Sequence, residues 1–190
     1  MKRERKQWEN EEVLQIGRRE AHTDFKRHDN FSEKISLNGE WKFLFLKAPE
    51  YSPEHFEEKN YADESWDGIK VPGCWELNGY GKLHYTDVWY LFPINPPFVP
   101  SENPTGIYRR TFEVKEGWKN EKIILRFDGV SSAYDVWING THVGYSKVSR
   151  LGSEFDITDY CEAGENQLTV RVYRWSDGTY LECQDMWWYS

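Results

Sequence analysis

Hydrophobic and polar residues divide the chain into two unequal parts. In the first part the apolar side chains are sparse and follow neither the helical nor the strand period. The main apolar anchors there are Trp8, Val13, Leu14, Ile16, Phe25 and Phe31. Residues 1–35 are therefore expected to form an extended amino-terminal arm that packs through a few side chains and has no core of its own.

From residue 36 onward the pattern changes to short runs that alternate between apolar and polar residues, as half-buried strands do. In the first run Trp41, Phe43 and Phe45 share one face. Asn139-Gly140 lies between two such runs and is a strong signal for a tight hairpin turn. The alternating runs are 41–45, 108–114, 123–127 and 167–173, and the runs on either side of the turn are 133–138 and 142–145.

The segments between these runs carry loop and turn signals. They are expected as a loop at 49–70 with one short helix near 53–59, a short extended piece at 71–75, a loop closure at 155–157 and a single turn at 158–160. Short strands, hairpin turns and the lack of a long helical pattern predict an all-β fold. We expect a jelly-roll β-sandwich over residues 36–190.

Residues 90–106 contain five prolines and show no periodicity. A central strand is excluded because each proline lacks a backbone donor. The stretch could be a disordered linker between two domains. Its apolar side chains, among them Phe92, Phe98 and Val99, favour a stiff, ordered loop packed on the sandwich.

The composition is that of a soluble domain with unusually many aromatic residues, 17 % of the chain. Most of these rings are expected in the core, because large aromatics fill sandwich interiors. A minority could line a sugar site, since the C–H face of a pyranose packs on an aromatic ring.

The formal net charge of −8 disfavours nucleic acid and anionic membranes as partners. Cys74, Cys161 and Cys183 are too few and too scattered for a disulfide framework. The chain also has no secretory signal pattern and no apolar run long enough for a membrane span. These features together predict a cytoplasmic protein with reduced thiols.

Two longer motifs carry a family resemblance. One is Asn95-Pro96-Pro97-Phe98-Val99-Pro100 with Glu102-Asn103-Pro104-Thr105-Gly106. The other is Arg174-Trp175-Ser176-Asp177-Gly178-Thr179-Tyr180-Leu181-Glu182, followed by Gln184-Asp185-Met186-Trp187. With weaker matches from Trp8-Glu9-Asn10 onward, the chain resembles the amino-terminal part of the long-chain β-galactosidases of glycoside hydrolase family 2.

The resemblance implies a galactose-binding-domain-like jelly roll followed by an immunoglobulin-like domain and a (β/α)₈ barrel. Two glutamates on the barrel act as acid/base and nucleophile in retaining hydrolysis of terminal β-D-galactosides such as lactose. This sequence stops at Ser190, where relatives continue into another strand of the sandwich. We therefore expect a truncated domain that holds no catalytic residue and is inactive alone. Its expected partners are the β-galactoside, the remaining domains or a complementing subunit, and copies of itself in a homo-oligomer when complete.

The resemblance also implies two substrate-binding residues. In relatives the aspartate of the Gln-Asp-Met-Trp motif contacts the sugar and helps bind sodium, and the matching residue is Asp185. A carboxylate suits both roles, because it accepts hydrogen bonds from hydroxyls and coordinates hard cations. The second contact in relatives is an asparagine, and Asp87 stands in its place. Asp87 can accept sugar hydroxyls but cannot donate to them.

Some relatives hold a structural magnesium ion between the arm and the Trp-Ser-Asp-Gly loop. Asn10, Val13 and Asp177 match that site, whereas Gln7 and Lys147 replace an acid and an amide. A lysine ammonium repels a metal cation, so this site is expected to be lost. Asp177 could instead be a simple turn residue before a glycine. Sodium and magnesium thus belong to the complete enzyme, and neither is expected to bind this chain tightly.

Two functions without chemistry stay open. A stand-alone carbohydrate-binding module shares the jelly-roll fold, and a complementing fragment would restore activity to a partner that lacks this region. The arm and the proline-rich motif favour a piece of a multidomain enzyme over a stand-alone module. β-Glucuronidases share the fold, but they lack the long proline motif.

Overall fold

The computed structural model of the chain describes residues 3–21, 33–85, 90–118 and 121–183. Its strands are β1 (Gln15–Ile16), β2 (Gly39–Leu46), β3 (Asp67–Val71), β4 (Thr105–Val114), β5 (Ile124–Phe127), β6 (Ala133–Ile138), β7 (Thr141–Lys147), β8 (Ser153–Asp156) and β9 (Gly164–Tyr173). One short α-helix, α1 (Thr179–Glu182), and 3₁₀ turns at Gln7–Glu9, Pro49–Tyr51, Trp75–Asn78, Glu116–Trp118 and Thr158–Tyr160 complete the described elements.

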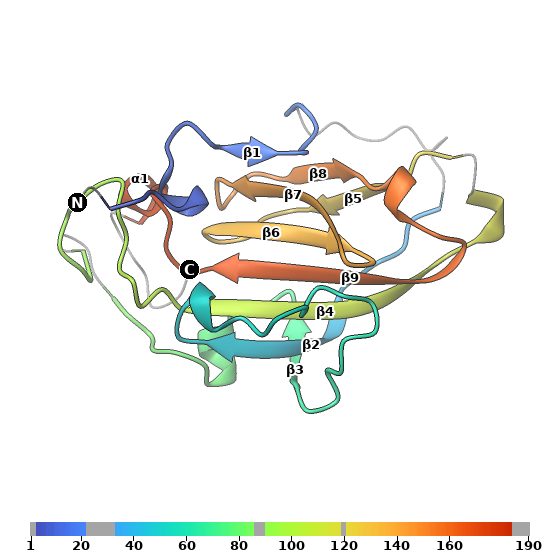
Figure 1. Cartoon of the computed structure of the whole chain (residues 1–190), viewed down its shortest axis with the longest axis horizontal. Coiled ribbons are helices and arrows are strands. Elements are labelled where there is room, and N and C mark those ends of the chain that lie inside the picture. Colours follow the sequence, from blue (N-terminus) through green and yellow to red (C-terminus); the bar gives the residue numbers. More distant parts are fainter. Residues whose placement is uncertain (1–2, 22–32, 86–89, 119–120, 184–190) are drawn as a thin grey trace.

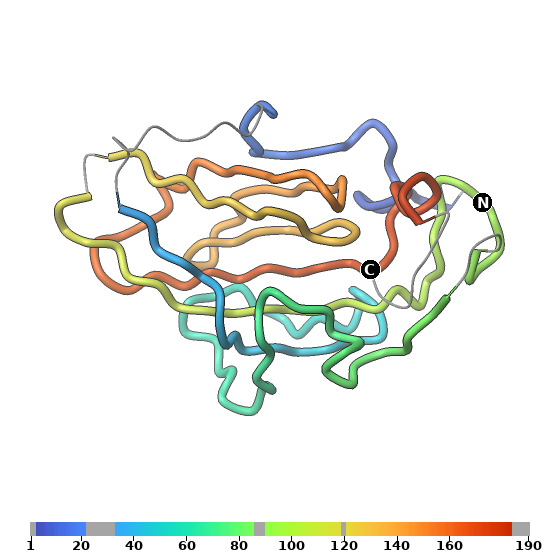
Figure 2. The backbone as a smooth tube through the Cα atoms, turned by 180° about the vertical axis from the view of Figure 1, so that it is seen from behind, coloured from blue at the N-terminus to red at the C-terminus, as the bar shows by residue number. Residues whose placement is uncertain are grey.

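The strands form two antiparallel sheets. The larger sheet has the order β1-β7-β6-β9-β4-β2-β3, and the smaller one pairs β5 with β8. The long strands β4 and β9 run side by side through the middle of the larger sheet, as both views show (Figures 1 and 2). The predicted all-β sandwich is confirmed.

The hairpin predicted at Asn139-Gly140 is confirmed as the turn between β6 and β7. Both residues have positive φ, at 50° and 84°, which this tight turn requires. Ile138 pairs directly with Thr141 across it. Local sequence chemistry therefore fixes the register of this hairpin.

The main core lies between the sheets and is rich in aromatic rings. It includes the inward faces of β2, β6 and β9, for example Phe43, Val136 and Leu168. Among the described tryptophans, five are buried: Trp41, Trp66, Trp75, Trp137 and Trp175. With the other buried and half-buried rings that pack in the core clusters, this confirms that most of the unusual aromatic content serves packing.

Three strands were not predicted, β1 in the arm and β3 and β8 in the sandwich, and the expected helix near 53–59 is wrong. β3 is an edge strand with one buried residue, Ile69, and one half-buried apolar residue, Val71, so its sequence offers too short an alternation to signal a strand. In β8 the buried side chain Glu154 is acidic, and Arg19 and Arg126 neutralise it. Both strands depend on partners that are distant in sequence, which periodicity cannot reveal. Residues 54–57 form a turn instead of a helix.

The described part of the arm lies along one edge and one end of the larger sheet (Figure 1). β1 pairs with β7 through Gln15 and Ile16, and Trp8 stacks on Tyr173 with ring centroids 4.3 Å apart. Glu9 is fully buried. The arm thus packs through few side chains, while the domain boundary at residue 35 stays a prediction.

Candidate functional site

The two sequence motifs, far apart along the chain, meet at one end of the sandwich. Asn103 in the proline-rich loop donates to the carbonyl of Trp175 and accepts from its backbone amide, both at 2.8 Å. The Tyr180 hydroxyl donates to the carbonyl of Phe98 at 2.6 Å. Val99 is buried beside Trp175 and Tyr180. The described part of the proline-rich stretch is therefore an ordered loop packed on the sandwich, as predicted, and not a solvated linker.

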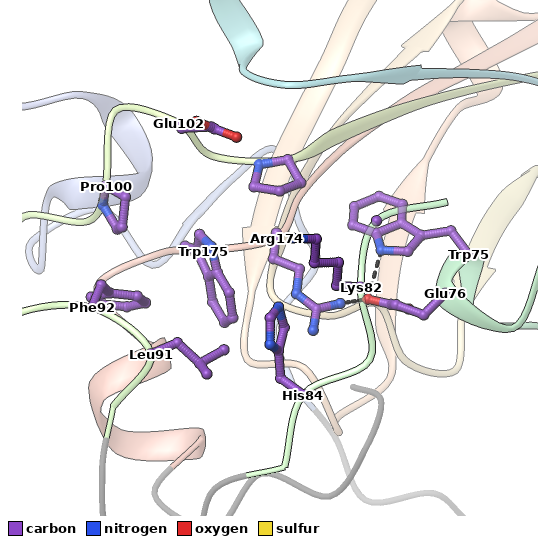
Figure 3. Close-up of a pocket in the computed structure, with 12 residues that line it drawn as sticks. Trp75, Glu76, Lys82, His84, Leu91, Phe92, Pro100, Glu102, Arg174 and Trp175 are labelled. Carbon is purple, nitrogen blue, oxygen red and sulfur yellow. Dashed lines mark hydrogen bonds and ion pairs between the residues drawn. The ribbon is translucent and has the colours of Figure 1, made fainter. Parts of the chain in front are cut away.

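A pocket of about 250 Å³ opens beside this junction (Figure 3). Its aromatic lining comes from Trp75, Phe92 and Trp175, and its charged lining includes Glu76 and Arg174. Aromatic rings beside charged groups offer what a sugar needs, an apolar platform and partners for hydroxyls. A larger hollow of about 630 Å³ runs along the inner face of the sheet and shares Trp75, Glu76 and Arg174 with the pocket.

A buried ion pair forms the polar wall of the pocket. Arg174 pairs with Glu76, and their side chains are only 5 % and 1 % exposed. Trp75 Nε1 donates to Glu76 Oε1 at 2.7 Å, and the Arg174 guanidinium lies over the Trp175 ring at 4.9 Å. Burial lowers the pKa of Arg174, while arginine keeps its charge at neutral pH.

This pair retains hydrogen-bonding capacity. Glu76 Oε2 and Arg174 Nη2 are buried and have no hydrogen-bond partner in the part of the chain that the structure describes. Buried polar atoms of this kind usually have a partner, because leaving them unpaired costs about 1–3 kcal/mol. Glu76 Oε2 is thus an unused acceptor and Arg174 Nη2 an unused donor within the residues that line the pocket.

Asp87 and Asp185 both lie outside the described residues, so their side chains are not placed. Their described neighbours are placed, and these converge on the pocket. His84 and Leu91, on either side of the segment that holds Asp87, both line it. Cys183 belongs to the same buried cluster as Trp175, and Trp175 lines the pocket. The described residues that flank Asp87 and precede Asp185 thus lie at this pocket or next to its wall.

Comparison with known proteins identifies the family. Residues 35–190 match the model of glycosyl hydrolases family 2, sugar binding domain. The chain belongs to this family. It is 47 % identical over 192 residues to a β-galactosidase of Psychromonas ingrahamii and 46 % identical over 196 residues to one of Vibrio vulnificus. These alignments cover 96 % and 98 % of the chain and 19 % of each relative.

Solved structures with the same architecture are β-glucuronidases of this family. That of Bacteroides uniformis has a TM-score of 0.55 at 26 % identity and covers 74 % of this chain and 14 % of that one. A Bifidobacterium dentium β-glucuronidase in complex with a coumarin glucuronide has a TM-score of 0.52 at 30 % identity. That match covers 72 % of this chain and 19 % of the other. The family 2 domain fold extends over most of the chain.

The Glu76–Arg174 pair was not predicted from the sequence. Arg174 opens the second motif, but Glu76 lies in a segment without a chemical signature, and the two residues are far apart in the chain. The available signal was weak: an acid beside Trp75 and an arginine at the end of an apolar strand. The fold brings them together, because Trp75 packs against Phe43 and Phe45 of β2 and Arg174 directly follows β9.

The described residues do not fit the magnesium site of some family 2 relatives. The Lys147 ammonium lies 2.7 and 2.8 Å from the two carboxylate oxygens of Asp177 and 2.9 Å from the carbonyl of Asn10. Gln7 donates to Asp135 at 3.3 Å. The Lys147 ammonium thus occupies the oxygens of Asp177 and Asn10 that a magnesium ion would need as ligands. Asp177 lies in the turn before Gly178, as its interpretation as a turn residue expects, and it also forms an ion pair with Lys147.

Within the described ranges, no group of three or more His, Cys, Asp or Glu side chains could hold a metal ion. The candidate sodium ligand, Asp185, lies beyond those ranges. None of the helices in the described residues is long and apolar enough to cross a membrane.

Proposed function

We propose that this sugar-binding domain serves a retaining β-galactosidase that hydrolyses terminal β-D-galactosides such as lactose. The main support is its 46–47 % identity to proteins named β-galactosidase over nearly the whole chain. The β-glucuronidases are less similar, at 26–30 % over about three quarters of it. Two candidate carboxylates also favour a neutral sugar, because they would repel the carboxylate of a glucuronide.

The chain covers 19 % of the relatives' length, so the relatives contain further domains. In the proposed enzyme two glutamates of a barrel domain outside this chain act as acid/base and nucleophile. The contribution of this chain is then binding and positioning, not bond cleavage. The proposed partners are the remaining domains or a complementing subunit, with further copies of the chain in a homo-oligomer. The enzyme is proposed to work in the cytoplasm.

Asp185 is the proposed contact to both galactose and sodium, and Asp87 is the proposed second contact to galactose. The observation that supports both roles is the position of their described neighbours: His84 and Leu91 line the pocket, and Cys183 belongs to the same buried cluster as Trp175 in its wall. An ionised carboxylate accepts hydrogen bonds from sugar hydroxyls and supplies oxygen to a hard cation. Asp87 can only accept, so its preferred partners are hydroxyl groups that donate.

The test is steady-state kinetics of Asp185 variants in the complete enzyme across a sodium titration. Asp185→Asn keeps the size and removes the charge, so the sodium concentration for half-maximal activity should rise first. Asp185→Ala also removes the hydroxyl contacts. Loss of a charge-assisted hydrogen bond costs about 1.5–3 kcal/mol, which predicts roughly a tenfold to hundredfold fall in kcat/KM.

Asp159 provides the matched control, because it is an exposed aspartate on the same domain. Asp159→Ala should leave kcat/KM and sodium dependence unchanged. If Asp185→Ala also matches the parent in both quantities, the assignment of Asp185 is wrong. A fall in kcat/KM without any change in sodium dependence would support the contact of Asp185 to the sugar. It would show that Asp185 does not bind sodium.

A further inference from the structure

Lys147 is a buried cation at the junction of the arm, the larger sheet and the loop before α1. Its side chain is 3 % exposed, and that of its partner Asp177 is 9 % exposed. Three oxygens surround the ammonium at 2.7–2.9 Å, two from Asp177 and one from the carbonyl of Asn10. An ammonium has three N–H donors, so its hydrogen-bonding capacity is filled.

The same two residues hold the backbone of the arm at three points. The carbonyl of Asn10 accepts from Lys147 Nζ, and the carbonyl of Leu14 accepts from the Lys147 backbone amide at 3.3 Å. The carbonyl of Trp8 accepts from the Asp177 backbone amide at 2.8 Å. Three carbonyls within seven residues of the arm therefore accept from Lys147 and Asp177, one from the ammonium and two from backbone amides.

We propose that the Lys147 ammonium is the built-in cation that docks the arm, so that docking needs no divalent metal. The positive charge of the ammonium binds the carboxylate of Asp177 and the carbonyl of Asn10, which would otherwise lack a good partner. A metal ion bound at this position would interact with the same oxygens. Magnesium demands six oxygens at about 2.1 Å and cannot share this space with an ammonium. Lysine also cannot be released by a chelator.

Docking through Lys147 also reaches the segment that leads to Asp185. Asp177 accepts from the backbone amide of Gly178 at 2.8 Å, directly before α1. The arm, the end of β7 and the start of α1 are thus joined by one charged group. We expect the arm to stay docked in buffers with and without divalent ions.

Amide hydrogen exchange of the 190-residue chain tests this proposal. The reporters are amides of residues 13–19, which include Arg19 bonded to the carbonyl of Glu154 at 2.8 Å. In the parent chain their exchange rates should be equal in excess EDTA and in millimolar magnesium. In Lys147→Met they should rise about tenfold to a hundredfold, since a buried charged hydrogen-bond partner is lost.

Lys122→Met is the matched control, because Lys122 is 79 % exposed and pairs only loosely with Asp156 at 3.7 Å. In Lys122→Met the arm amides should exchange as in the parent. In both variants the β9 amides report whether the sandwich is folded. Should Lys147→Met fail to fold, Asp177→Asn keeps the shape of the partner and should also speed arm exchange. Arm exchange that EDTA accelerates and magnesium restores in the parent would overturn the proposal, as would unchanged arm exchange in a folded Lys147 or Asp177 variant.

Discussion

The 190-residue chain alone should not hydrolyse a chromogenic β-galactoside above the solvent background. A retaining glycosidase needs two carboxyl groups roughly 5–5.5 Å apart on either side of the scissile bond. In the proposed enzyme both belong to a barrel outside this chain. Enzymes accelerate reactions by at least about 10⁶-fold, so the turnover of chain and complete enzyme should differ by that factor or more. A purified preparation free of host galactosidase provides the measurement.

The same preparation separates the alternative functions. One carboxylate contact to a sugar contributes about 1–3 kcal/mol, less than the roughly 4 kcal/mol of a millimolar complex, so calorimetry should detect weak galactose binding or none. Micromolar binding would favour a stand-alone carbohydrate-binding module. Turnover similar to that of a complete relative would contradict the assignment of catalysis to another domain. Activity that appears on mixing with a partner lacking this region would identify a complementing fragment.

Glu76→Gln should destabilise the domain by about 3–5 kcal/mol, because it leaves the charge of Arg174 buried without its counter-ion. For a domain of this size that loss corresponds to a fall in Tm of roughly 6–20 °C. The substitution keeps the shape of the side chain, so lost packing does not explain the effect. Thermal and urea unfolding of the chain measure it.

Glu102→Gln is the matched control, since Glu102 lines the same pocket but is exposed. Its stability should change by no more than about 0.5 kcal/mol. Replacing Glu76 and Arg174 together by Leu and Met should recover part of the loss, because apolar residues can substitute for a buried ion pair. Parent-like stability of Glu76→Gln would show that the Glu76–Arg174 ion pair does not support the pocket wall.

The fold was predictable where neighbouring residues carry the information. Alternation predicted β2 and β9, and the Asn139-Gly140 turn predicted the hairpin between β6 and β7. β3 and β8 were missed because their stability comes from distant partners. Ile69 pairs with Trp41 on β2, and Glu154 in β8 is neutralised by Arg19 of the arm and Arg126 of β5. Such tertiary compensation leaves no periodic pattern in the strand itself.

The candidate site, too, was predictable from the sequence only in part. The apolar side chains of 90–106 predicted an ordered loop, and the family motifs identified Asp185 and Asp87 as candidates. They could not show that Asn103 joins the two motifs, or that Glu76 faces Arg174, because both contacts depend on how β9 packs. The departure at Lys147 was visible in the sequence. Its consequence, a buried pair with Asp177 that holds the arm, needed the structure.

The most direct measurement for the proposed function is a crystal structure of the complete enzyme with galactose and sodium bound. We predict an Asp185 carboxylate oxygen within about 2.5–3.2 Å of a sugar hydroxyl, with sodium coordinated by the same side chain. The two barrel glutamates should lie on either side of the anomeric carbon. Galactose ordered between those glutamates, with Asp185 out of hydrogen-bonding reach of both sugar and sodium, would contradict the proposed role of this domain.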